Sequence, residues 1–195
     1  MSAKDDIERL LKQRKSHVDA ETKVRQKALE DRRGAQIQLL KDRKKFVANC
    51  GIQAVLEEIN EDILERAGEV KRIEGIFTYL SESGEYRSDI TEITCPVYGY
   101  TLSWNDGASG IFVGCSGSSK YPGLRIYGFL PRNESDAAEL LNGIVGLSRQ
   151  PSVIVDGVKD THKNRGTSLD ELHAEVRSAI YTVVIEHKDK GTLSF

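Results

Sequence analysis

The chain has 195 residues, of which 38% are hydrophobic and 30% are charged, and its formal net charge is −2. This size fits one medium domain with an appendage, and the charged share exceeds the globular norm of about 25%. We find no apolar run approaching the roughly 18 residues of a membrane span and no apolar signal region at the N-terminus. Three scattered cysteines favour a reducing compartment over a disulfide framework. These features predict a cytoplasmic protein without a membrane segment.

Charge is unevenly distributed along the chain. Residues 1–45 carry 14 Lys and Arg against 8 Asp and Glu, a net of +6, which leaves −8 for residues 46–195. A basic arm on an acidic body indicates contact with phosphates or with the protein's own acidic surface.

Residues 3–48 contain no proline and only one glycine, Gly34, and their apolar side chains fall on one face at about 100° per residue. One apolar row repeats every eleven residues, at Ile7, Val18, Leu29 and Leu40. Such a period gives a nearly straight or slightly right-handed stripe. Because a lone helix of this kind is marginal in water, it needs a packing partner. We therefore expect a coiled-coil-like arm over residues 1–49, packed on a second copy, on the rest of the chain or on another protein.

Residues 50–195 predict a compact α+β domain. A helix stop at Asn49-Cys50-Gly51 precedes a second helix, from Ile52 to about Ala67, with an acidic outer face. Short alternating runs then predict an antiparallel β-meander with a turn at residues 105–107. Its strands are expected at residues 72–80, 90–104 (broken at Pro96), 111–115 and 124–130.

The C-terminal part predicts two further helices with a short strand between them. The first helix is expected over residues 134–148 and the strand over residues 152–156. The final helix begins at a capping box formed by Ser168 and Glu171. Tyr181–Ile185 would also suit a strand, which leaves the last turns of this helix open.

One short stretch carries a recognisable spacing of cysteines, glycines and aromatic residues. Its characteristic positions are Cys95, Pro96, Gly99, Leu102, Gly110, Phe112, Gly114, Cys115, Ser116, Tyr121 and Pro122. Residues 95–124 thereby resemble the C4 zinc ribbon at the C-termini of bacterial type I topoisomerases. The second and fourth ligand positions hold Tyr98 and Leu124. Because structural zinc needs four ligands, we expect no metal in this stretch. We also expect no other cofactor.

The resemblance implies a metal-free ribbon that helps to hold single-stranded DNA. Aromatic side chains would offer stacking faces and the basic arm would contact phosphates. The candidate nucleic-acid-binding residues are Lys12, Arg14, Lys15, Arg32, Arg33, Lys44, Lys45, Tyr98, Trp104 and Tyr121. The structural alternatives are an ordinary β-hairpin with core aromatics and a solvated helix face.

No catalytic constellation emerges from the sequence. Asp156 followed by Glu186 and Lys188 resembles the metal site of restriction-type nucleases, but a helix is expected to run through Glu186. We assign no catalytic residue. The favoured function is a non-enzymatic interaction or scaffold protein that uses the arm for self-association or partner binding. The alternative is a nucleic-acid-binding accessory protein with a ribbon-like β-element.

Overall fold

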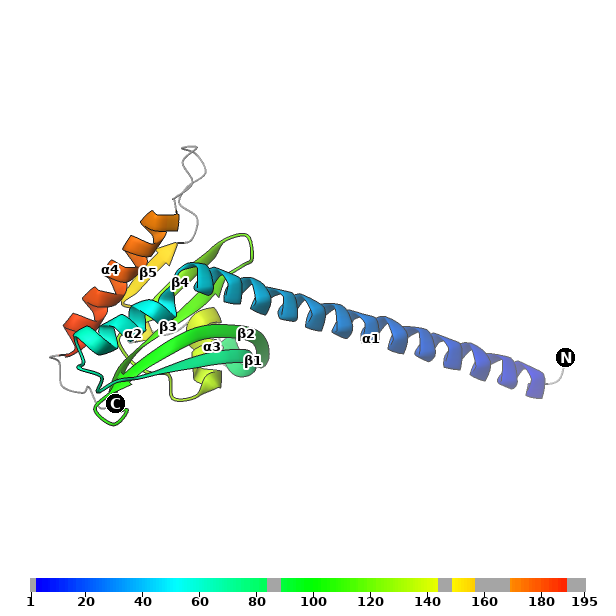
Figure 1. Ribbon diagram of the computed structural model, residues 1–195. Coiled ribbons are helices and arrows are strands. Elements are labelled where there is room, and N and C mark those ends of the chain that lie inside the picture. The colour runs from blue at the N-terminus through cyan, green and yellow to red at the C-terminus, as the bar shows by residue number, and fades with distance from the viewer. Residues whose placement is uncertain (1–2, 84–88, 144–148, 157–168, 189–195) are drawn as a thin grey trace. The chain divides into compact units, whose positions relative to one another are not determined.

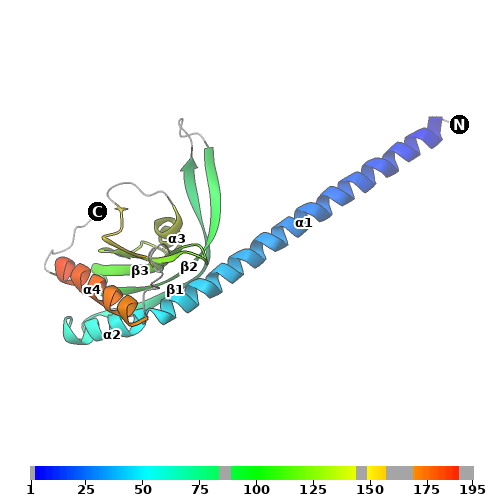
Figure 2. The same ribbon diagram turned by 90° about the horizontal axis from the view of Figure 1, so that it is seen from above.

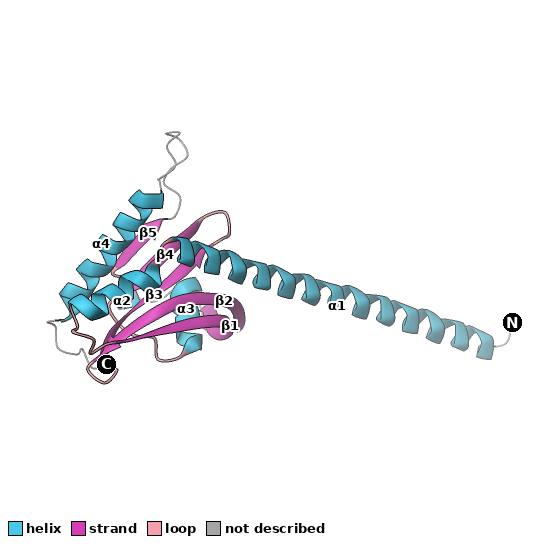
Figure 3. Cartoon of the chain, in the orientation of Figure 1, coloured by secondary structure: helices cyan, strands magenta, loops and turns pink. Residues whose placement is uncertain are grey.

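The computed structural model describes residues 3–83, 89–143, 149–156 and 169–188 (Figure 1). The elements within these residues are α1 (Ala3–Asn49), α2 (Ile52–Asp62), β1 (Glu69–Ser83), β2 (Asp89–Trp104), β3 (Ser109–Gly117), β4 (Pro122–Tyr127), α3 (Glu134–Asn142), β5 (Val153–Asp156) and α4 (Leu169–Lys188). This order, coloured by element type in Figure 3, confirms the predicted α+β class. The long first helix, the short second helix, the meander and the two later helices around a short strand are all present.

The chain divides into two compact units, residues 1–38 and 39–195. The last turns of α1 belong to the second unit, because Leu40 and Phe46 pack against its core and Val47 lies within that core. Residue 49, the expected boundary, is where α1 ends. The division into units falls earlier because the end of the helix is part of the folded domain.

The second unit is built on one antiparallel sheet whose strands follow chain order from β1 to β5. β1 and β2 pair along their whole length. β3 pairs with β2 only between Gly99 and Trp104. The two long strands therefore continue beyond the rest of the sheet as a two-stranded ribbon (Figure 2).

Helices cover both faces of this sheet (Figure 1). Successive side chains of a strand point to opposite faces, so β2 divides its side chains between two cores. Tyr98, Leu102 and Trp104 join the core that also holds residues of α2 and α4. Val97 joins Phe112 and Tyr127 in the core under α3.

Two local predictions are confirmed by the backbone. Gly51 separates α1 from α2 in the left-handed conformation, with a φ of 65°. Asn105, Asp106 and Gly107 form the β2–β3 turn with φ values of 54°, 55° and 82°. Both segments use residues that tolerate this conformation. α2 ends at Asp62, earlier than predicted, because the chain turns through Glu65 and Arg66 with positive φ.

β2 runs through Pro96 without the expected break. Proline lacks an N–H group and is normally excluded from central strands. Pairing between β2 and β3 begins only at Gly99. Pro96 therefore removes no hydrogen bond from the β2–β3 ladder, and the strand continues.

The C-terminal elements follow the prediction within the described residues. α3 ends at Asn142, and the expected continuation over residues 144–148 lies outside them, as does Ser168 of the predicted capping box. Tyr181–Ile185 is helical, because α4 extends to Lys188.

Asp136 is a buried carboxylate near the start of α3. It accepts hydrogen bonds from the Arg132 backbone and guanidinium groups, both at 2.9 Å, and from Arg149 at 2.6 Å. Burial acts to raise the pKa of Asp136, but these bonds outweigh it and hold the pKa below its usual range. The ionised form is therefore the one that the fold stabilises.

The Asp136 interaction should be lost in acid. The pKa of Asp136 in the folded protein lies below the value of about 3.9 in the unfolded chain. The stabilisation by ionised Asp136 is therefore fully present above about pH 3.9 and disappears as the pH falls through the folded pKa. We expect wild type to exceed Asp136→Asn in free energy of unfolding at pH 6, and the difference to shrink at pH 3. Urea unfolding of both proteins at both pH values measures this difference in free energy of unfolding. An unchanged difference would contradict the role of ionised Asp136.

Candidate functional site

α1 carries apolar side chains that remain exposed to water. They are Val18, Val24, Leu29 and Ile37, and Val24 keeps 70% of its surface exposed. Val18 and Leu29 belong to the predicted eleven-residue row, Val24 lies on the same face, and Ile37 lies off it. A helix in solution gains most of its stability by burying such a face. The first unit therefore presents an apolar stripe available for contact.

Charged residues of both signs flank and interrupt this stripe. Between residues 12 and 38, α1 carries eight Lys and Arg and four Asp and Glu. Glu21, Arg25 and Arg32 are exposed, and at about 100° per residue they lie near the centre of the stripe. The surface is thus apolar, basic on balance, and able to form ion pairs with a partner.

The last turns of α1 are fixed to the domain by Arg43. This side chain is only 3% exposed and donates to three oxygen atoms from separate elements. Nη1 donates to the Pro96 carbonyl of β2, and Nη2 donates to the Gly117 carbonyl at 3.0 Å and to Asn142 Oδ1 at 2.9 Å. Burial lowers the pKa of the guanidinium. All three acceptors are neutral, so these bonds do not balance the charge.

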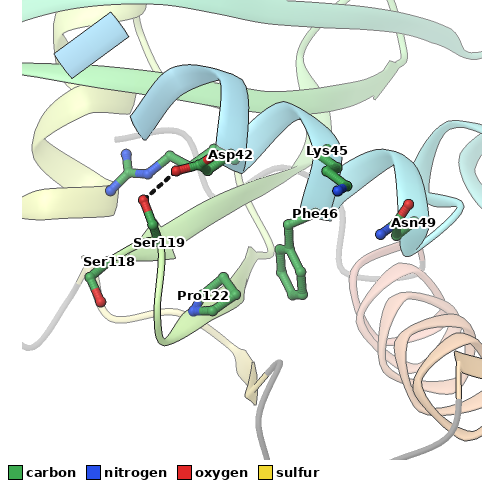
Figure 4. A pocket seen from close by; sticks show the side chains of 8 residues that line it. Asp42, Lys45, Phe46, Asn49, Ser118, Ser119 and Pro122 are labelled. Carbon is green, nitrogen blue, oxygen red and sulfur yellow. Dashed lines mark hydrogen bonds between the residues drawn. The ribbon is translucent and has the colours of Figure 1, made fainter. Parts of the chain in front are cut away.

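A pocket of about 290 Å³ lies between the end of α1 and the β3–β4 loop. Figure 4 shows Asp42 of the helix and Ser119 of the loop directed toward each other. Ser119 Oγ donates to Asp42 Oδ2 at 2.5 Å across this gap (Figure 4). The lining residues are Asp42, Arg43, Lys45, Phe46, Asn49, Ser118, Ser119 and Pro122.

The predicted nucleic-acid-binding aromatics fall into two groups. Tyr98 and Trp104 are buried in the sheet's core, so their rings are not open to a base. Tyr121 is 59% exposed, and Lys120 Nζ lies 5.0 Å from the centre of its ring. One of the three predicted stacking faces is therefore on the surface.

The predicted basic residues lie along α1 rather than in one cluster. Lys44 is held by Glu74 at 3.0 Å, and Lys45 lines the pocket. The remaining five are exposed on the helix, namely Lys12, Arg14, Lys15, Arg32 and Arg33. Lys45 thus lies next to the loop that carries Tyr121. The five exposed cations belong to the first unit, earlier in the chain.

The two cysteines that carry the ribbon resemblance lie in different cores. Cys95 belongs to the core under α3, and Cys115 to the core that holds α2 and α4 residues. Burial raises the pKa of Cys115 to about 11 and that of Cys50 to about 12. Both thiols are protonated at neutral pH and are poor nucleophiles. In the described part of the chain, no group of three or more His, Cys, Asp or Glu is placed to hold a metal ion.

The residues that resemble a nuclease site occupy unsuitable elements. Glu186 and Lys188 lie on α4, and Lys188 Nζ donates to the Ile63 carbonyl at 2.8 Å. Asp156 ends β5. The Glu and Lys that such a site needs on a strand are here on a helix.

The sequence prediction counted Arg43 among the basic residues of the arm but did not single it out as a site residue, and it did not include Ser118 or Ser119. A signal for Arg43 existed, because it lies three residues from both Leu40 and Phe46 and so falls within the apolar stripe. A cation at such a position needs polar partners. Ser118 and Ser119 gave no signal, since their role depends on contact with a helix more than 70 residues earlier.

The fold and this site define an α+β domain preceded by a long, charged helix. Comparison with known families, curated proteins and solved structures finds no family model and no protein or structure that matches the chain. None of the described helices has the length and apolar character needed to cross a membrane.

Proposed function

We propose that this protein is a non-enzymatic interaction protein whose N-terminal helix pairs with the same helix of a second copy. The observation that supports the proposal is the exposed apolar stripe of the first unit, represented by Val18, Val24 and Leu29. Its eleven-residue period allows two nearly straight helices to stay in contact along their length. Pairing would supply the buried face that a lone helix lacks.

Charge favours an antiparallel arrangement. In an antiparallel pair centred between Gln26 and Lys27, Glu21 of one helix lies at the same height as Arg32 of the other. Both positions lie near the centre of the stripe, so the two side chains can form an ion pair twice in the dimer. Parallel pairing would instead bring Arg25 and Arg32 beside their own copies.

Few large apolar side chains contribute to the stripe, so the interface is small. Small interfaces are typical of weak, reversible complexes. We therefore expect a dimer whose dissociation constant is on the order of micromolar.

The nucleic-acid alternative has less support. Tyr98 and Trp104 are buried, and acidic residues are interleaved with the arm's basic ones. Nonspecific phosphate binding depends on the density of positive charge, which this interleaving reduces.

Polar substitutions within the stripe should weaken pairing. We expect the full chain to show a concentration-dependent monomer–dimer equilibrium in sedimentation velocity, and the double substitution Val24→Gln and Leu29→Gln to weaken it at least about tenfold, equivalent to roughly 1.4 kcal/mol. Glutamine forms helix as readily as the residues it replaces, so loss of helix is not the expected cause.

Ala20→Gln provides the matched control, because Ala20 is exposed and lies off the stripe. It should dimerise like wild type. A wild-type chain that remains monomeric at about 100 μM, well above the expected dissociation constant, would exclude self-association through this helix. Equal weakening by the control would exclude the stripe as the interface.

A further inference from the structure

The pocket beside the end of α1 is lined by a buried positive charge whose hydrogen-bond acceptors are all neutral. Arg43 lines it, is almost completely buried, and has an Nε atom without a hydrogen-bond partner. Its three hydrogen-bond acceptors are two backbone carbonyls and one amide oxygen. A buried cation whose hydrogen-bond partners carry no charge is unfavourable.

The other lining groups add donors around the same space. Lys45 contributes a second positive charge, and Asn49 contributes a side-chain amide. Ser118 Oγ accepts from the Tyr121 backbone N–H at 3.2 Å, and its own hydroxyl hydrogen remains to be donated. These donors come from two segments, the last turns of α1 and the β3–β4 loop.

Asp42 is the acidic residue in the lining. Its Oδ2 atom accepts a 2.5 Å hydrogen bond from Ser119, so this carboxylate is directed to the loop. Two cations against one carboxylate leave the lining residues with a formal charge of +1. A singly charged anion would balance this charge.

We propose that this pocket binds an oxyanion of the phosphate type. Ammonium, hydroxyl and amide donors on two segments that line one pocket suit a tetrahedral anion with several acceptor oxygens. A planar carboxylate has fewer directions in which to accept them. Arg43 attracts the anion through its charge, while its hydrogen bonds to Pro96, Gly117 and Asn142 hold the end of α1 beside the loop. This site is independent of the pairing of the N-terminal helices.

The test is a titration of the full chain with sodium phosphate at constant ionic strength. Backbone amide resonances of Ser118, Ser119 and Lys120 should shift and saturate, with a dissociation constant on the order of millimolar for the free ion. Sodium chloride and sodium acetate serve as parallel titrations. No saturable shift with phosphate would overturn the proposal, and acetate binding with equal affinity would overturn the assignment of a tetrahedral anion.

Lysine variants separate this site from general charge attraction. Lys45→Gln should weaken phosphate binding about tenfold, as expected for one charged donor. Lys41→Gln removes the same charge one turn earlier, from an exposed residue that does not line the pocket, and should leave the affinity unchanged. Equal losses in the two variants would show that binding is nonspecific and would overturn the proposal.

Discussion

Arg43→Met is expected to lower the free energy of unfolding of the domain by about 3 kcal/mol. Methionine keeps much of the arginine volume but leaves three buried or half-buried acceptors, on Pro96, Gly117 and Asn142, without their donor. Each hydrogen bond to a charged group contributes about 1.5–3 kcal/mol. Removing the buried guanidinium charge is itself favourable, and this gain offsets part of the lost hydrogen-bond free energy. Urea unfolding followed by fluorescence measures the loss, because the single tryptophan, Trp104, is buried in the core.

Lys41→Met is the matched control for this experiment. Lys41 is exposed two residues before Arg43 on the same helix, and surface substitutions of this kind change stability by no more than about 0.5 kcal/mol. Equal stability of Arg43→Met and Lys41→Met would contradict the anchoring role of Arg43.

Gly99→Ala should destabilise the sheet by about 3 kcal/mol, at the upper end of overpacking effects. Gly99 on β2 lies opposite Gly114 on β3. A Cβ atom at Gly99 would collide with the Val113 carbonyl oxygen, which belongs to the backbone of the neighbouring strand. Because backbone cannot rotate away as a side chain can, the two strands would have to separate. The same Trp104 fluorescence measurement applies.

Gly114→Ala tests whether the loss of stability depends on what the added Cβ atom meets, backbone at Gly99 or side-chain ends at Gly114. A Cβ atom there would lie 2.7 Å from the two methyl groups of Leu141 and 2.9 Å from Phe112 Cζ. These side-chain ends can move, so we expect a smaller loss, about 1 kcal/mol. A larger loss for Gly114→Ala than for Gly99→Ala would contradict this account.

The parts of the fold that the sequence predicted are those with local causes. The left-handed Gly51 and the Asn105–Gly107 turn need particular residues at particular places, and a local sequence shows them. The sequence left open whether Tyr98 and Trp104 offer stacking faces or lie in the core of a β-hairpin. Both are buried, and this outcome depends on the helices packed against the sheet.

The site depends on contacts between distant segments, which no local pattern encodes. The division of the chain at residue 38 follows from the packing of Leu40 and Phe46 on the core. The pocket requires the β3–β4 loop to reach the end of α1. Helical periodicity places Arg43 on the apolar side of α1, but its acceptors become known only when the sheet and α3 are in place.

The anchoring of Arg43 has a consequence for the order of events during biosynthesis. Its three acceptors lie 53, 74 and 99 residues further along the chain. Translation proceeds from the N-terminus, so α1 leaves the ribosome well before Asn142 has been made. Its last turns must wait, with their apolar side chains uncovered, until β2, β3 and α3 have assembled. Attachment of the helix to the domain is therefore a late, long-range step of folding, although the helix itself is synthesised first.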